Sequence, residues 1–244
     1  MNFARKITWL TLFSVAMGFM ETAIVIYLRK IYYPQGFCFP LIPVEPGIAL
    51  VEFLREAATI IMLLAIGLLS GQTAPQKFSF FIYCFAIWDL VYYLFLKVFL
   101  NWPESLSTWD ILFLIPVPWV GPVWAPCIIA LTMILFAALI NYKVEKGFEA
   151  KIKATEWMLF ITGSLVIIAS FITPYMQYLQ QAGASAWTLA SSRELFDEIK
   201  QFVPASYNWM LFVSGEAMLL AGLALYAGRA PSAPKKRFSE FNKE

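Results

Sequence analysis

Ionisable residues interrupt hydrophobic segments of this chain that are long enough to cross a lipid bilayer. Eight lie within or at the edge of such segments: Glu21, Glu52, Arg55, Glu56, Asp89, Lys97, Asp110 and Glu216. A charged side chain at membrane depth costs about 2.5 kcal/mol or more, so such residues usually face a protein interior or a wet cavity. Carboxylates gathered in this way could bind a cation or a small solute, or exchange protons with one.

Spacing along the chain places several of these residues on shared helix faces. Two stripes result: Glu52, Arg55, Glu56 and Thr59 by their i, i+3, i+4 and i+7 relation, and Asp89, Tyr93 and Lys97 by an i, i+4, i+8 relation. We therefore predict one polar site, lined by Tyr93 together with the eight ionisable residues named above.

The charges in this predicted site do not balance. Six carboxylates accompany two cations, so the site would be strongly negative unless carboxyl groups are protonated or a cation is bound. We expect Glu216 or Glu21, which have no basic neighbour on their own helices, to be neutral or to pair across helices. In the alternative interpretation, buried ion pairs of Arg55 and Lys97 only fix the register of the helices. Lys97 could also extend to the outer interface of the membrane.

Several kinds of chemistry are excluded by what the chain lacks. It has no His, which removes His-ligated haem, the usual zinc and non-haem iron sites and His-based catalysis. It also has no phosphate-binding Gly-rich loop, dinucleotide fingerprint, GxSxG motif or EF-hand loop. We predict neither a cofactor nor a metal site. A net charge of +2 gives no indication of nucleic-acid binding.

The elements that must position these residues are membrane-spanning helices. With 60% hydrophobic and 14% charged residues, the chain is far more apolar than a soluble domain of its length. Windows of about 20 apolar residues predict one transmembrane domain over residues 1–228, an all-α bundle of six helices. The predicted spans are 7–28, 48–70, 78–100, 123–140, 157–179 and 208–226.

Three further segments complete the predicted architecture. Residues 111–122, ILFLIPVPWVGP, are apolar but too short and too rich in Pro to span, which favours a re-entrant or interfacial segment. Residues 192–203 carry a capping box and helical periodicity, and predict an amphipathic helix on the outer surface. Residues 229–244 are a basic tail, expected to be flexible and cytoplasmic.

The distribution of Lys and Arg predicts the orientation of the bundle. With the N-terminus inside, twelve of these residues fall on the inner side and four on the outer side, which are Arg29, Lys30, Arg193 and Lys200. We therefore predict an integral protein of the plasma (inner) membrane with both termini in the cytoplasm. The segment 141–155, a mixture of Lys and Glu, is interpreted as a solvated connection on that side.

The outer side is rich in Pro and Trp, which could either form an ordered cap or only mark the ends of spans. Cys38 and Cys127 are both placed there, as free thiols or as a pair, whereas Cys84 lies inside a span. In the last span, the spacing of small residues predicts a seam for close helix contact, about a quarter-turn from Glu216. The residues of this seam are Ala217, Ala221, Ala224 and Gly228.

Three classes of function are compatible with this architecture. The first is a carrier or ion pathway, with or without proton coupling. It is suggested because titratable groups occur in several spans and because Pro residues, including Pro174, interrupt predicted helices. The second is an enzyme that acts on a lipid-like substrate at the outer leaflet, with Glu52 and Glu56 as acid and base and Arg55 holding an anion. The third is an accessory subunit that binds a partner membrane protein. Membrane lipids are expected partners in every case. No nucleophile stands out, so the sequence favours a non-enzymatic role.

Overall fold

The structure is a computed structural model that describes residues 2–42, 44–115, 117–181 and 202–229. In this part of the chain six helices are long and apolar enough to cross a membrane, as the sequence predicts. They are α1 Phe3–Tyr32, α2 Pro46–Ser70, α3 Ala74–Leu100, α4 Trp124–Glu145, α5 Ala154–Gln181 and α7 Trp209–Gly228. The predicted amphipathic helix lies outside the described residues except at Phe202 and Val203, and the predicted tail lies outside them except at Arg229.

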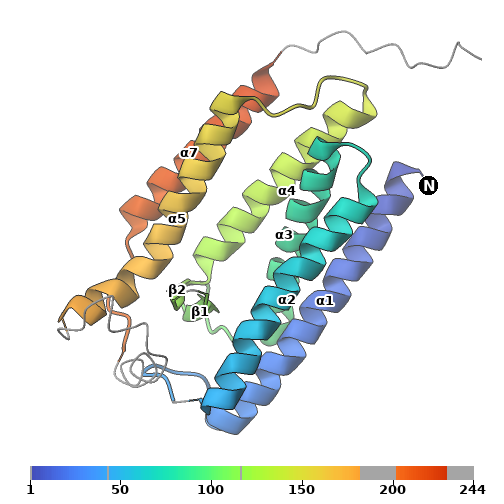
Figure 1. Cartoon of the computed structure of the whole chain (residues 1–244). Coiled ribbons are helices and arrows are strands. Elements are labelled where there is room, and N and C mark those ends of the chain that lie inside the picture. Colours follow the sequence, from blue (N-terminus) through green and yellow to red (C-terminus); the bar gives the residue numbers. More distant parts are fainter. Residues whose placement is uncertain (1, 43, 116, 182–201, 230–244) are drawn as a thin grey trace, which may run out of the picture.

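The helices run along one common direction and the chain reverses at the two ends of the bundle (Figure 1). The start of α1 shares one end with the α2–α3 and α4–α5 connections, and we call this the N-terminal end. The α1–α2 connection and a short β-hairpin lie toward the opposite end, which we call the hairpin end. Large apolar side chains cover the outside of the helices, such as Leu69 at 83% and Met210 at 86% exposed. A surface of this kind suits contact with lipid.

Several helices begin or end at capping residues that an apolar window does not detect. Asn2 caps α1 by accepting a hydrogen bond from the Arg5 amide at 2.9 Å. Asn208 caps α7 through the Leu211 amide at 3.1 Å. Helix α3 ends at Asn101, which adopts a left-handed conformation with φ 52° that Gly and Asn adopt more readily than other residues. At the start of α1 the cap extends the helix four residues beyond the predicted span, whereas α3 ends at the predicted residue and α7 begins one residue later than predicted.

The segment between α3 and α4 is an antiparallel hairpin, a form that the sequence analysis did not predict. Strand β1, Trp109–Phe113, pairs with β2, Trp119–Pro122, with Asp110 opposite Gly121. The prolines that oppose a helix fall in the turn or at the strand end, where Pro is tolerated, while the strands are rich in β-branched and aromatic residues. The hairpin packs against α5, where the rings of Trp119 and Phe171 stack at 6.3 Å.

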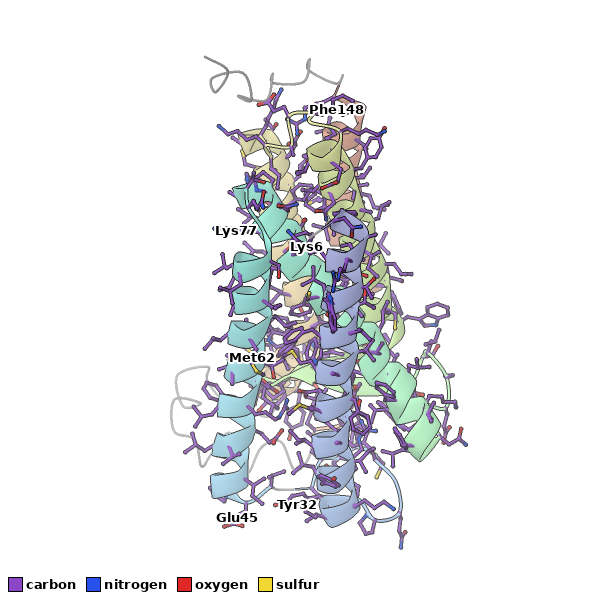
Figure 2. The ribbon with its side chains drawn as sticks, turned by 90° about the vertical axis from the view of Figure 1, so that its right-hand side faces the viewer. Lys6, Tyr32, Glu45, Met62, Lys77 and Phe148 are labelled. Carbon is purple, nitrogen blue, oxygen red and sulfur yellow. The ribbon has the colours of Figure 1, made fainter. Side chains whose placement is uncertain are left out.

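The helices form two groups. Helices α1 and α2 both pack on α3, which packs on α4, whereas α5 packs extensively on α7. Helices α1 and α2 lie side by side (Figure 2), and long polar side chains connect them. Near the N-terminal end Lys6 donates to the carbonyl of Ser70 at 2.9 Å, and near the middle Arg55 pairs with Glu21.

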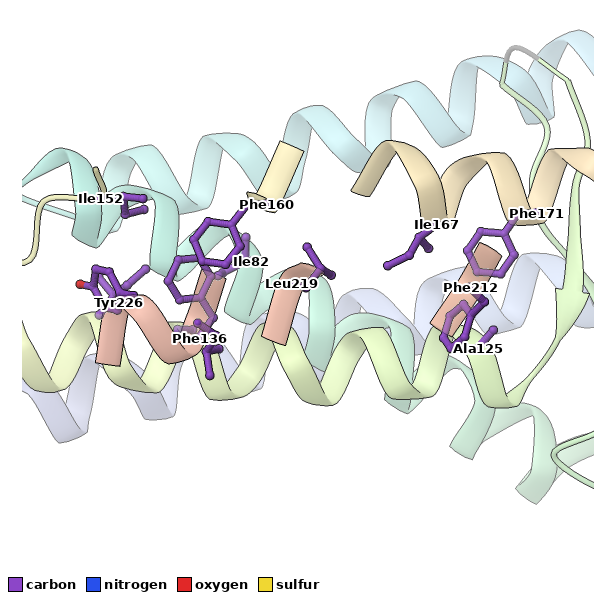
Figure 3. Packing of buried hydrophobic residues seen from close by; sticks show 13 residues of the cluster. Ile82, Ala125, Phe136, Ile152, Phe160, Ile167, Phe171, Phe212, Leu219 and Tyr226 are labelled. Atoms are coloured by element: carbon purple, nitrogen blue, oxygen red, sulfur yellow. The ribbon is translucent and has the colours of Figure 1, made fainter. Parts of the chain in front are cut away.

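The main core lies where α3, α4, α5 and α7 meet. Its 13 buried residues follow α7 from Tyr226 to Phe212 (Figure 3). The rings of Phe136 and Phe160 approach within 4.3 Å and close the bundle toward the N-terminal end.

The predicted seam on α7 is wrong. Ala217, Ala221, Ala224 and Gly228 are all exposed. The contact is made by the glycine face of the helix instead, because a Cβ placed on Gly215 would lie 2.8 Å from the carbonyl oxygen of Gly163 in α5. Spacing identified small residues correctly but selected the wrong face.

Two other interpretations of the sequence need correction. Helix α5 continues through Pro174 without a break, so the interrupted helix invoked in favour of a carrier is not present there. The 141–155 connection is only partly solvated, since Lys143 and Ile152 are buried. Lys143 donates to the carbonyl of Tyr226 at 2.6 Å and thereby ties the connection to α7.

Candidate functional site

A cavity of about 330 Å³ lies inside the bundle, lined by all six helices and the hairpin. We call it the central cavity. Its charged lining residues are Glu21, Arg55, Glu56 and Asp89. Glu21 lies eleven residues before the end of α1, about 16 Å along the helix axis. The cavity is therefore well inside the membrane-spanning part of the structure.

Arg55 forms ion pairs with two of the acids. Its Nε donates to Glu52 on the same helix at 2.8 Å, and its Nη1 donates to Glu21 on α1. The cross-helix partner that the sequence analysis expected for Glu21 is thus present. Because both carboxylates share one guanidinium, this group retains an excess of negative charge when all three side chains are ionised.

Glu56 connects α2 to the hairpin. Its carboxylate accepts a hydrogen bond from the Leu114 amide at 3.0 Å. This is a neutral donor, so it orients the carboxylate without cancelling its charge. The side chain remains part of the wall of the central cavity.

Asp89 differs from the other acids of the central cavity. Its side chain accepts no hydrogen bond from any residue that the structure describes, although it lines the central cavity. A second carboxylate, Asp110, lies close enough to repel the charge of Asp89. Asp89 is half-buried, and a carboxylate largely withdrawn from water without a partner is unfavourable, so Asp89 is the acid of the central cavity that most needs a ligand or a proton.

Asp110 has its own partners. The Arg29 guanidinium pairs with one carboxylate oxygen at 3.3 Å and the Tyr93 hydroxyl donates to the other at 3.2 Å. Arg29 also lies over the Trp102 ring at 3.7 Å. Burial raises the pKa of Asp110, and the charge of Arg29 and the hydrogen bonds of the Ile111 amide and Tyr93 oppose this shift. Arg29, Tyr93 and Asp110 therefore form a buried cluster, and Tyr93 also lines the central cavity.

Arg29 is the member of this cluster that the sequence analysis missed, because it counted Arg29 among the charges of the outer loop. A signal was present, since Glu21, Val25 and Arg29 follow an i, i+4, i+8 relation. The last turn of α1 extends beyond the predicted span and carries Arg29 into the protein interior.

Two predicted residues lie away from the central cavity. Lys97 is exposed and donates a hydrogen bond to the carbonyl of Pro103 at 2.9 Å, which stabilises the loop after α3. Glu216 is buried on α7, where the Thr132 hydroxyl of α4 donates to its carboxylate. Asp89 and Tyr93 both line the central cavity, whereas Lys97 lies at the surface, so the predicted stripe is divided between two environments.

A smaller cavity of about 190 Å³ lies on the hairpin side of the central cavity. Arg55, Glu56 and Tyr92 line both cavities. The two cavities are therefore adjacent.

The central cavity combines acids with aromatic walls. Four acids stand in or beside it, Glu21, Glu52, Glu56 and Asp89, against the one guanidinium of Arg55. Its walls include Trp88, Tyr92 and Trp119. In the described part of the chain no three acids or cysteines converge in a geometry that could hold a metal ion. Aromatic faces and carboxylates together suit an organic cation.

The cysteines add no further chemistry to the site. All three are free, with Cys38 exposed, Cys84 buried and Cys127 half-buried.

Neither a protein family model, nor a curated protein, nor a solved structure matches this chain.

Proposed function

We propose that this integral membrane protein binds an organic cation in the central cavity and acts as a carrier for it. The observation that supports this most directly is Asp89, a carboxylate that lines the cavity and has no hydrogen-bond partner among the described residues. An ammonium group beside it would offset the charge that the protein leaves uncompensated.

An organic cation suits the cavity better than a bare metal ion. Metal ions such as Ca²⁺ require six to eight oxygen ligands, whereas the acids in this cavity are dispersed over three helices and partly used by Arg55. The indole rings of Trp88 and Trp119 offer faces for cation–π contact with an ammonium group. A volume of about 330 Å³ accommodates a small organic molecule.

The proposed route to the site begins at the hairpin end. The smaller cavity lies on that side, and the Arg55–Glu56 pair stands between it and the central cavity. Toward the N-terminal end the rings of Phe136, Phe160 and Tyr226 close the core. The distribution of Lys and Arg predicts that the hairpin end faces outward, and with that orientation the arrangement would correspond to an outward-accessible state.

Binding of tetraethylammonium to the protein in lipid nanodiscs tests the proposal. We expect Asp89→Asn to weaken binding about tenfold, roughly 1.4 kcal/mol, without lowering the melting temperature. Glu149→Gln is the matched control, because Glu149 is an exposed carboxylate of the α4–α5 connection. Equal affinity in all three proteins, or absence of binding in the wild type, would refute the proposed function.

A further inference from the structure

A third cavity continues the central cavity toward the N-terminal end. Its volume is about 350 Å³, and Phe78, Ile82, Phe136, Trp157 and Phe160 are among the apolar residues of its wall. We call it the apolar pocket. Four residues line both spaces, namely Ile129, Met133, Ser164 and Leu219. A ligand in the central cavity therefore has apolar space directly adjacent to it.

The apolar pocket also reaches the surface of the bundle. Ile161 and Leu165 of α5 line it and are 55% and 61% exposed. Toward the N-terminal end, helices α3 and α5 are bridged by the rings of Phe78 and Trp157, 5.1 Å apart. Toward the hairpin end the two strands bridge them, because Phe113 of β1 stacks on Phe85 of α3 and Trp119 of β2 stacks on Phe171 of α5. The pocket lies between these two bridges and opens on a face that would contact lipid.

The charges and the apolar surface are separated along the same axis. Asp89 and Ile82 lie seven residues apart on α3, about 10 Å along the helix, and Phe78 is about 16 Å from Asp89. From the acids of the central cavity to the aromatic rings of the apolar pocket, the wall thus changes from anionic to predominantly apolar, with the hydroxyl residues Thr132 and Ser164 as its polar members. This is the polarity pattern of an amphipathic molecule.

We infer that the ligand is an amphipathic amine with a single alkyl chain, which places its ammonium group beside Asp89 and its chain in the apolar pocket. The inference rests on the proposed function and specifies the substrate class of the same site. Such a molecule would be embedded in the lipid phase, and the opening between α3 and α5 gives its chain lateral access. An anionic lipid is disfavoured, because its headgroup would face the excess of carboxylates.

A photo-crosslinking experiment tests this inference. The probe is dodecylamine with a diazirine at the end of its chain, added to the wild-type protein in lipid nanodiscs and mapped by peptide mass spectrometry. We expect adducts on Met133, Phe160 and Ile161. Tetraethylammonium in excess should reduce them at least fivefold, and Asp89→Asn should reduce them about tenfold. The competition uses unaltered protein, so it does not depend on how the variant folds.

Two comparisons control for simple partitioning of the probe into lipid. Met158 and Met210 are 68% and 86% exposed on the lipid-facing surface, and their adducts should not respond to the competitor. A dodecanoic acid probe with the same diazirine should not label the apolar pocket. Adducts confined to the lipid-facing surface, or equal labelling of the pocket by both probes, would overturn the inference. The proposed function fails separately, if tetraethylammonium itself does not bind.

Discussion

The buried carboxylates of this protein differ in how their charge is met. Asp110 has a guanidinium and a phenol, Glu21 and Glu52 share Arg55, and Glu56 has a backbone amide. Asp89 has none of these within the described residues, yet it lines the central cavity. The first group of contacts stabilises the fold, whereas an acid without a partner creates a demand that a ligand can satisfy.

Asp110 provides a pH-dependent test at the level of one residue. Burial raises its pKa above the ordinary value, so the folded protein holds this proton more tightly than the unfolded chain does. The stability that this carboxyl contributes is present below its unfolded pKa and is lost as the pH rises through its folded pKa. We expect the unfolding free energy of the wild type, relative to Asp110→Asn, to fall between pH 4 and pH 8.

Denaturation of both proteins at a series of pH values measures this difference. A difference that instead increased with pH would mean that Arg29 outweighs burial and stabilises the ionised carboxylate.

The sequence pointed to the charged residues that line the central cavity but not to all of their partners. Helical spacing was sufficient to select Glu52, Arg55 and Glu56, because residues on one helix face are fixed relative to each other. It could not show that Arg29 meets Asp110, since that contact joins residues 81 positions apart. Lys97 lies at helical spacing from Asp89 and Tyr93, as a buried cation of the site would. However, the loop after α3 provides carbonyl oxygens that accept hydrogen bonds from it at the surface.

At the level of elements, polar side chains hold α1 and α2 together. Both helices pack on α3, and Arg55 connects them through Glu21. Removal of the guanidinium would leave two buried carboxylates unpaired. We expect Arg55→Ala to lower the unfolding free energy by about 3 kcal/mol, measured as resistance to denaturation by sodium dodecyl sulfate.

Lys97→Ala is the comparison, because Lys97 is a cation of the same predicted set but is exposed. Its loss should cost no more than about 1 kcal/mol. Equal costs for the two variants would contradict the structural role assigned to Arg55.

The glycine face of α7 determines how closely it packs on α5. A Cβ on Gly215 would lie 2.7 Å from the Ile167 side chain and 2.8 Å from the Gly163 carbonyl, too close for a stable contact. We expect Gly215→Leu to destabilise the protein by about 2 kcal/mol or more through overpacking. Ala217→Leu on the exposed face should change stability by less than about 0.5 kcal/mol.

Thermal unfolding of the two variants in the same detergent distinguishes them. Greater sensitivity at Ala217 would restore the seam first predicted from the sequence.

The sequence predicted the helices of the bundle well and the hairpin poorly, for a physical reason. A run of about 20 apolar residues has one stable solution in a bilayer, because a helix satisfies its own backbone hydrogen bonds. Residues 109–122 form their backbone hydrogen bonds only with a partner strand and with neighbouring helices. Glu56 of α2, for example, accepts a hydrogen bond from the Leu114 amide. Contacts of that kind depend on the tertiary structure and leave no local periodicity.

At the level of the whole molecule, the two groups of helices enclose a series of cavities. The smaller cavity, the central cavity and the apolar pocket share lining residues in pairs, from the hairpin end toward the N-terminal end. Whether this series opens outward depends on the orientation of the bundle, which we infer from the excess of Lys and Arg on one side.

Cys38 provides a natural probe of that orientation. It is exposed in the α1–α2 connection, whereas Cys84 is buried and Cys127 half-buried. We expect a membrane-impermeant maleimide to label intact cells at Cys38, with Cys38→Ser as the unlabelled control. Labelling that requires permeabilised cells would place the hairpin end in the cytoplasm and reverse the proposed route.

The central claim is that the central cavity holds a cationic ligand beside Asp89. Native mass spectrometry of the protein, released gently from its own membrane, tests it most directly when wild type, Asp89→Asn and Glu149→Gln are compared. We predict a bound amine in the wild type and in Glu149→Gln that is absent from Asp89→Asn. A partner protein retained equally by all three, with no small molecule bound, would contradict the account and favour an accessory subunit.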